Sequence, residues 1–238
     1  MKKVLITGAN KSIGFETARQ LLQKGYYIYL GSRNAEKGQE AVEKLKTEGL
    51  TQVEVIQIDV SDDESVKNAR IELGKKTDVL DVLINNAGMS GGRENQSATN
   101  TDISFYKEVF EVNYFGVVRV AQAFFDLLKK SPEPRIVNVS SSQASLTLHS
   151  DPTWKYYQNK GAVYNPSKSA LNMYTIGLAY ELRDLPFKAN AIDPGFIAID
   201  FNNHRGTGNV EEAGKRIVKY ATIDANGPTG KFFSQIHL

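Results

Sequence analysis

The chain has 238 residues, 41% of them hydrophobic, and its 29 basic and 27 acidic residues leave a formal net charge of +2. This length and composition suit one domain with a sizeable core over residues 1–238. The balanced charge favours a small-molecule partner and gives no reason to expect a nucleic acid or a membrane. The sequence has no cysteine, which excludes disulfides, zinc–thiolate sites and cysteine nucleophiles.

The first residues, Met1, Lys2 and Lys3, are basic like the start of a targeting segment. The apolar run VLIT that follows them is too short for a signal peptide or a membrane span. We therefore expect a cytoplasmic protein.

Short apolar runs alternate with longer segments of helical spacing along the chain. The runs are VLIT, YYIYLG, VEVIQID, DVLINN, RIVNVSS and KANAID, and the helical segments include 13–24, 35–48 and 62–75. This alternation predicts βαβ units, and strands that are apolar on both faces predict a parallel sheet covered by helices. The predicted fold class is α/β with a doubly wound sheet. Three irregular segments, 89–100, 149–162 and 196–209, are candidate loops over a site.

The stretch TGANKSIG lies between the first predicted strand and a helix that we expect to begin near Ile13. Gly8 permits a sharp turn, and Gly14 permits close packing of helix on strand. Backbone N–H groups at such a helix start suit a phosphate. Ser12 stands where these turns usually have glycine; its hydroxyl either donates to a phosphate or caps the helix. Taken alone, the turn fits a structural loop as well as a phosphate site.

Six motifs follow one another in the order found in a known family. They are TGANKSIG, NNAG, EVNYFG, VSSS, YNPSK and DPG, and they extend over essentially the whole chain. On these motifs the chain resembles the short-chain dehydrogenase/reductase family, and on NKSIG and NGPTGKFF it is most similar to the NADPH-dependent carbonyl reductases within it. The resemblance implies a Rossmann-type doubly wound, mainly parallel seven-stranded sheet with helices on both faces. It also implies an NADP-dependent oxidoreductase.

The catalytic candidates Tyr164 and Lys168 lie four residues apart in YNPSK. If a helix begins near Pro166, they share one face, and the ammonium lies beside the phenol. The ordinary phenol pKa of about 10 is lowered by a nearby cation. In isolation such a pair is usually a solvated surface pair. The resemblance implies that Tyr164 is the acid/base and that Lys168 lowers its pKa and binds the nicotinamide ribose.

A serine run and a single asparagine supply two further candidates. The run VSSS offers Ser140, Ser141 and Ser142, and the resemblance assigns Ser141 to holding the substrate carbonyl. The other two serines fit a role in capping local backbone. Asn113, in EVNYFG, interrupts an apolar helical pattern. It either hydrogen-bonds neighbouring backbone or, as the resemblance implies, anchors a water linked to Lys168.

The segment YYIYLGSRN bears on the choice of cofactor. It has no acidic residue before Arg33, where a site for NAD normally has one. Arg33 and Lys11 can instead pair with a 2′-phosphate, which predicts NADPH/NADP+, although a lone surface arginine is usually only solvated. The cofactor-binding residues expected from the turn and from the resemblance are Gly8, Asn10, Lys11, Ser12, Ile13, Gly14, Arg33, Asp59, Val60, Asn85, Asn86, Ala87, Gly88, Tyr164, Lys168, Pro194, Gly195 and Ile197.

Two features depart from the family pattern. Ile199 occupies the position of a threonine that holds the nicotinamide carboxamide, so that side-chain hydrogen bond is lost. Tyr164 lies 23 residues after Ser141, a longer separation than in most of the family, because SDPTWKYYQNKG intervenes. This insertion is either one wall of an apolar substrate pocket or a surface elaboration. In the carbonyl reductases such an insertion covers a tetramer face, so a monomer is plausible and a homo-oligomer stays open.

The predicted function is NADPH-dependent reduction of a ketone or aldehyde, reversible as alcohol oxidation, with Tyr164 as general acid. One alternative is a non-catalytic NADP(H)-binding sensor, which Ser12 and Ile199 motivate. The other is an NAD-dependent alcohol dehydrogenase of the same family. The three histidines do not have metal-ligand spacing, and the sequence has no G-x-S-x-G nucleophile elbow.

Overall fold

The computed structural model describes residues 1–92 and 96–234; residues 93–95 of the predicted loop 89–100 lie outside the described part. Seven strands form one sheet in the order β3-β2-β1-β4-β5-β6-β7, and all neighbouring strands pair in parallel. This sheet confirms the predicted fold class. The strands are β1 (Lys3–Ile6), β2 (Tyr27–Ser32), β3 (Val53–Gln57), β4 (Val82–Asn85), β5 (Arg135–Val139), β6 (Lys188–Ile192) and β7 (Phe232–Phe233).

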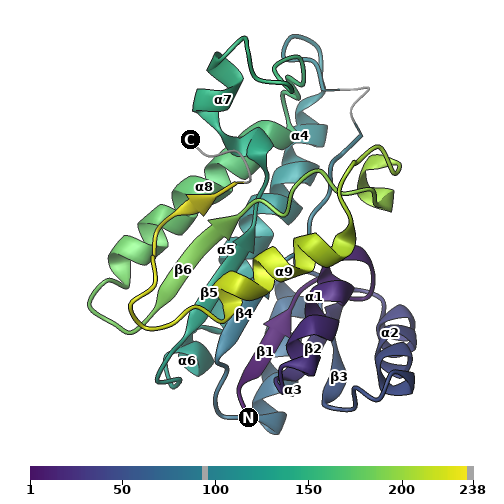
Figure 1. The fold of residues 1–238 in the computed structure, drawn as a ribbon, viewed down its shortest axis with the longest axis vertical. Helices are drawn as coiled ribbons and strands as arrows, with labels where there is room; N and C mark the ends of the chain where they lie inside the picture. The colour runs from purple at the N-terminus through teal and green to yellow at the C-terminus, as the bar shows by residue number, and fades with distance from the viewer. Residues whose placement is uncertain (93–95, 235–238) are drawn as a thin grey trace.

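Helices cover both faces of the sheet (Figure 1). Neighbouring strand residues point to opposite faces: Val4 and Ile6 belong to one core cluster and Leu5 to the other. The α-helices are α1 (Ser12–Gln23), α2 (Ala35–Thr47), α3 (Asp63–Lys76), α4 (Ile103–Phe110), α5 (Gly116–Ala123), α6 (Phe125–Leu128), α7 (Leu146–Ser150), α8 (Tyr164–Glu181) and α9 (Val210–Ala221). Within the described residues there are also a π-helical turn, η1 (Glu111–Phe115), and two 3₁₀ turns, η2 (Ser142–Ala144) and η3 (Asp200–Asn202).

The division of helices between the two faces follows the core clusters. Side chains of α1, α2 and α9 pack on one face, and side chains of α3, α5, α6 and α8 pack on the other. In Figure 1, α1 and α9 lie side by side across the near face. Among the described residues, no helix is both long and apolar enough to cross a membrane.

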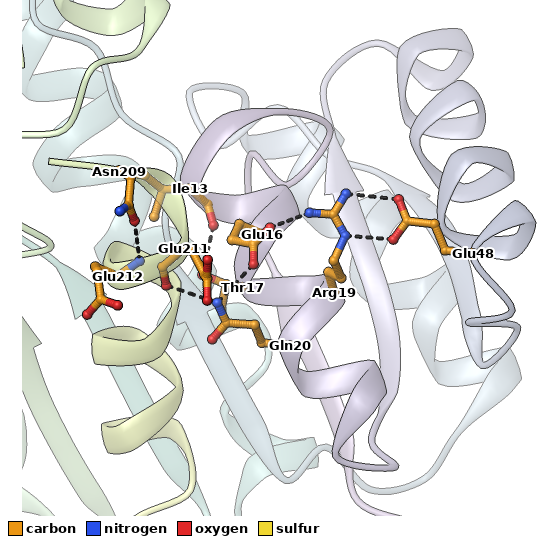
Figure 2. Close-up of polar contacts among 9 residues, drawn as sticks. All are labelled: Ile13, Glu16, Thr17, Arg19, Gln20, Glu48, Asn209, Glu211 and Glu212. Atoms are coloured by element: carbon orange, nitrogen blue, oxygen red, sulfur yellow. Dashed lines mark hydrogen bonds and ion pairs between the residues drawn. The ribbon is translucent and has the colours of Figure 1, made fainter.

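Helix α1 is tied to its neighbours by polar side chains (Figure 2). The Arg19 guanidinium donates to both carboxylate oxygens of Glu48 after α2, at 2.7 and 2.9 Å, and also pairs with the buried Glu16. On the other side, Gln20 Nε2 donates to the Glu211 carbonyl oxygen of α9 at 3.0 Å. The helix that begins at the TGANKSIG turn is therefore anchored on both flanks.

The order of the strands reverses once, between β3 and β4. It builds β1, β2 and β3 outward in one direction and then returns to place β4 on the other side of β1. In open parallel sheets, a crevice forms outside the carboxyl ends of the strands at such a switch point. The topology therefore places a ligand site next to the turn that follows β1.

Candidate functional site

A cavity of about 1340 Å³ lies at the carboxyl edge of the sheet. Its walls come from the segments that directly follow β1, β2, β3, β4, β5 and β6, together with the start of α8. The predicted site residues that line it are Gly8, Asn10, Lys11, Ser12, Ile13, Gly14, Arg33, Asp59, Val60, Asn86, Ala87, Gly88, Ser141, Tyr164, Lys168, Pro194, Gly195 and Ile197. Asn85 and Asn113 do not line it.

The turn after β1 is tight enough to require glycine at two positions. Gly8 has a φ of +61°, and a Cβ there would lie 2.9 Å from the Ala87 Cα. A Cβ on Gly14 would lie 2.7 Å from the Gly8 carbonyl oxygen and 2.5 Å from Asn86 Nδ2. Both glycines are thus required by close approach of backbone, as the sequence predicts.

Ser12 does not cap the helix, which is one of the two roles expected for its side chain. The N-cap of α1 is Lys11, which makes no side-chain cap, so Ser12 does not cap the helix. Instead Ser12 itself has a φ of 54°, in the left-handed region. Glycine is the usual residue in that region because a side chain there costs free energy. The serine at this position therefore affects the conformation of the backbone as well as the space beside a bound phosphate.

The two asparagines of NNAG have different surroundings. Asn86 Nδ2 donates to the carbonyl oxygens of Thr7 and Gly8, at 2.9 Å each, which fixes the turn against β4. Asn85 is buried, and its Nδ2 donates to Asn138 Oδ1 at 2.9 Å. The Asn85 side chain is therefore used within the core, which differs from the expectation that Asn85 binds the cofactor.

Arg33 and Asp59 lie at the ends of adjacent strands. Arg33 directly follows β2 and is exposed, and Asp59 accepts hydrogen bonds from the Ser61 hydroxyl and amide at 2.6 and 3.0 Å. Burial raises the pKa of Asp59, but the Ser61 hydrogen bonds and the charges of Arg33 and Arg119 outweigh it, so the pKa lies below its usual value. The charge of Arg33 therefore helps to keep Asp59 ionised.

Lys168 is the buried cation of the site. Its side chain is 4% exposed, Nζ donates to the Val139 carbonyl oxygen at 2.8 Å, and Nζ lies 6.0 Å from the Tyr164 ring centroid. Burial lowers the pKa of Lys168 to about 8. Helix α8 begins at Tyr164, two residues before the expected start, because Pro166 fits the first turn, where a helix needs no N–H donor. The two side chains nevertheless lie together as the spacing predicts.

Asn113 is fully buried and lies in the π-helical turn η1. Its Oδ1 accepts from the Met89 amide at 2.9 Å, and its Nδ2 donates to the Met89 carbonyl oxygen and to Ser167 Oγ, at 2.9 and 3.0 Å. These contacts match the first alternative, a bond to neighbouring backbone. A water between Asn113 and Lys168 stays a prediction. The sequence gives no signal for the π-helical turn, a feature often found at functional sites.

The contacts of Ser140 and Ser141 differ from the expected ones. Ser141 Oγ caps η2, accepting from the Gln143 amide at 3.2 Å, while Ser140 Oγ donates to Asn172 Oδ1 of α8 at 2.6 Å. Capping therefore falls on Ser141 itself, the residue assigned to the substrate. Because this bond uses the hydroxyl as an acceptor, its hydrogen can still point into the cavity.

Aromatic residues form the remaining wall of the cavity. Tyr156 and Phe196 pack edge to face with ring centroids 5.7 Å apart, and Phe201 packs on Tyr164 at 5.8 Å. Trp154 is only 7% exposed and packs behind Tyr156 without lining the cavity. The insertion is therefore a cavity wall. Phe196 and Phe201 lie in the segment 196–209 that is predicted as a loop over the site, but no motif marks these two residues individually.

A comparison with family models decides the class of the chain. The model described as short chain dehydrogenase matches residues 2–209. The chain belongs to this family. The match confirms the resemblance drawn from the six motifs, and it makes the protein an enzyme of the oxidoreductase class.

Named relatives match this short-chain dehydrogenase over almost its full length. The (+)-neomenthol dehydrogenase of Capsicum annuum is 32% identical, with 96% of this chain and 94% of that protein covered. That alignment runs over 299 positions, more than this chain has residues, so the relative contains segments that this chain lacks.

Solved structures match as well. Salutaridine reductase from Papaver somniferum has a TM-score of 0.85 and 28% identity, with 98% of this chain and 99% of that chain covered. ElxO with NADP bound has a TM-score of 0.83 and 28% identity, with 97% of this chain and 95% of that chain covered. The fold of this chain therefore matches these reductase structures over nearly the whole of each chain.

Proposed function

We propose that this short-chain dehydrogenase is an NADPH-dependent carbonyl reductase that acts on a ketone or aldehyde and also runs the reverse alcohol oxidation. The observation that carries the proposal is that Ser141, Tyr164 and Lys168 line the same cavity as the turn after β1. Relatives named as a dehydrogenase and as reductases, and an NADP-bound neighbour, support it. Because the neomenthol dehydrogenase contains segments that this chain lacks, the substrate of that relative is not assigned to this protein.

The turn fits a dinucleotide. Its glycines leave no room for a Cβ, and the backbone N–H groups at the start of α1 are the donors that a pyrophosphate requires. Arg33, directly after β2, and Lys11, in the turn after β1, both line the cavity and offer positive charge to a 2′-phosphate. In our proposal Asp59 and Val60 contact the adenine, Ala87 and Gly88 contact its ribose, and Pro194, Gly195 and Ile197 hold the nicotinamide.

The protein supplies the proton and the polarisation of the carbonyl. When bound, NADPH supplies a hydride to the carbonyl carbon. Ser141 donates a hydrogen bond to the carbonyl oxygen, where negative charge develops. Tyr164 transfers its phenol proton to that oxygen, and the Lys168 ammonium stabilises the phenolate that remains. The bond from Lys168 to the Val139 carbonyl holds the ammonium in place.

The test mixes the protein with NADPH or NADH and a panel of ketones and aldehydes, and follows the absorbance of the reduced cofactor. We expect turnover with NADPH, loss of turnover in Tyr164→Phe by roughly 100-fold or more, and unchanged NADPH binding in that variant. Tight NADPH binding without turnover of any carbonyl compound would favour the sensor. Faster turnover with NADH would favour the NAD-dependent dehydrogenase.

Three finer predictions accompany this proposal. We propose that the partner is a small carbonyl compound or its alcohol, that the protein is cytoplasmic, and that residues 1–238 form one domain that functions as a monomer, with a homo-oligomer as the alternative. Size-exclusion chromatography with light scattering tests the monomer, and a dimer or tetramer would contradict it.

A further inference from the structure

Gln96 connects the loop after β4 to the first residue of α8. It is polar but only 8% exposed. Its Oε1 accepts from the Tyr164 amide at 2.9 Å, and its Nε2 donates to the carbonyl oxygens of Ser90 and Gly92 at 2.7 and 2.5 Å. Its backbone oxygen also accepts from the Ala162 amide at 3.1 Å. One residue thus makes four hydrogen bonds to two segments that both line the cavity.

The contact with Tyr164 serves as a cap for α8. The N-cap residue of this helix, Val163, makes no side-chain cap. The first amides of a helix lack partners within the helix, and Gln96 satisfies the amide of the first residue from 68 positions away in the sequence. Because that residue is Tyr164, the cap fixes the point from which the phenol extends into the cavity.

The other end of the same amide holds the loop that faces the catalytic side chains. Met89, next to Ser90, is bound to Asn113, and Ser90 Oγ donates to the Phe201 carbonyl oxygen at 3.0 Å. Phe201 in turn packs on the Tyr164 ring. Through these contacts, Gln96 connects the start of α8 to the loop that binds Asn113 and Phe201.

Gly161 leaves the space in which the Gln96 amide lies. A Cβ at that position would lie 2.8 Å from Gln96 Oε1 and 3.3 Å from Asn165 Oδ1. The arrangement thus depends on two residues, Gln96 and Gly161, that neither the catalytic motifs nor the cofactor-binding turn include.

We propose that Gln96 is a positioning residue that sets the geometry of proton transfer from Tyr164. This proposal rests on the proposed carbonyl reduction. Small displacements of a catalytic group slow the reaction strongly while leaving distant binding contacts intact. Loss of the Gln96 contact is therefore expected to lower kcat and to leave the affinity for NADPH unchanged.

Gln96→Leu tests the contact from one side. We expect kcat to fall roughly 10-fold or more, an unchanged Kd for NADPH, and a larger solvent deuterium isotope effect on kcat, because proton transfer becomes slower. Gln39→Leu, at an exposed glutamine of α2, is the matched control and should keep wild-type kinetics. A wild-type kcat and isotope effect in Gln96→Leu would overturn the proposal.

Gly161→Ala tests the same contact from the other side. The added Cβ displaces the Gln96 amide from its hydrogen bonds, so the melting temperature should fall without preventing folding, while kcat falls and the isotope effect rises. Gly177→Ala, on the exposed side of α8 with nothing within 4 Å of its Cβ, is the control and should keep kcat. Gly161→Ala also tests the proposal if Gln96→Leu fails to fold. An unchanged kcat in Gly161→Ala would overturn the proposal.

Gln96→Glu gives a pH readout. The introduced carboxylate keeps the acceptor for the Tyr164 amide but meets the Ser90 and Gly92 carbonyl oxygens without a hydrogen. Protonation restores one donor, so the ratio of variant to wild-type kcat should rise as the pH falls. A ratio that is constant with pH would contradict the role of the Nε2 bonds. These results are separate from the test of function, because carbonyl turnover that is lost in Tyr164→Phe supports the reductase whatever the Gln96 variants do.

Discussion

The two sides of the cavity are held together by different means. The turn side, residues 7–14, is fixed mainly by bonds to the adjacent strands: the Thr7 and Ala9 amides donate to carbonyl oxygens of Ile84 and Gly31 at 3.0 and 2.8 Å, and the Asn86 side chain adds bonds to the Thr7 and Gly8 carbonyl oxygens. The loop side, residues 89–92, 156–161 and 196–205, relies on side chains such as Ser90 and Gln96 that reach between distant segments. The sheet thus determines the shape of the cofactor end, and long-range side-chain contacts determine the shape of the substrate end.

Lys168 gives the largest expected effect, because in our proposal it stabilises the Tyr164 phenolate, and the resemblance implies that it also binds the nicotinamide ribose. Lys168→Met removes the cation beside Tyr164, so kcat for carbonyl reduction should fall by roughly 100- to 10,000-fold. Steady-state kinetics with NADPH measure the loss. Lys219→Met, the same change at an exposed position of α9, is the control and should retain activity. Retained turnover in Lys168→Met would mean that the phenol needs no cation.

The pH dependence of stability checks the burial of Lys168. Burial lowers its pKa from 10.5 to about 8, so between these values the unfolded chain binds more protons than the folded one. The free energy of unfolding of the wild type should therefore rise, relative to Lys168→Met, as the pH increases from about 8 toward 10.5, and should not diverge below pH 8. Urea titrations of both proteins without cofactor measure this difference. Parallel pH profiles would show that Lys168 titrates normally.

Arg33 tests the turn side alone. Charge-assisted hydrogen bonds contribute about 1.5–3 kcal/mol, so Arg33→Ala should raise the KM for NADPH by roughly 10- to 100-fold. The KM for NADH and the kcat should change little, because Arg33 lies at the end of β2, away from Tyr164. Arg183→Ala, at an exposed arginine that does not line the cavity, is the control. An equal loss with both cofactors would contradict a contact with the 2′-phosphate.

The same contrast explains which parts of the molecule could be predicted. The sheet, the requirement for Gly8 and Gly14, and the pairing of Tyr164 with Lys168 follow from local rules: periodicity, backbone conformation and helical spacing. Gln96 and Phe201 could not be found in this way. Their contacts join segments far apart in the chain, and neither lies in a motif.

Ser141 and Asn113 lie between these cases. Motif order identified them, but their hydrogen bonds to Gln143 and Met89 depend on the exact course of η2 and η1. Residue type and spacing alone do not specify a 3₁₀ or a π-helical turn. The sequence therefore predicted which residues to examine, and the structure supplied what they contact.

The smallest expected effect is that of Ser12→Gly, which changes the backbone of the turn directly. Ser12→Gly removes the cost of a side chain at a φ of 54°, about 1–2 kcal/mol. The added freedom of glycine in the unfolded chain offsets roughly 0.5–1 kcal/mol of this gain. We therefore expect the free energy of unfolding to rise by less than about 1.5 kcal/mol. Thermal and urea unfolding measure this change.

The matched control for Ser12→Gly has the opposite sign. Ser104, exposed in the first turn of α4, does not have a positive φ, so Ser104→Gly should destabilise by about 0.5 kcal/mol or less. In Ser12→Gly the reaction and kcat should be unchanged, while the KM for NADPH shifts because a hydroxyl is lost beside the phosphate site. A change in kcat instead would show that the backbone of the turn also controls the geometry at Tyr164. The two sides of the cavity would then not be held independently of each other.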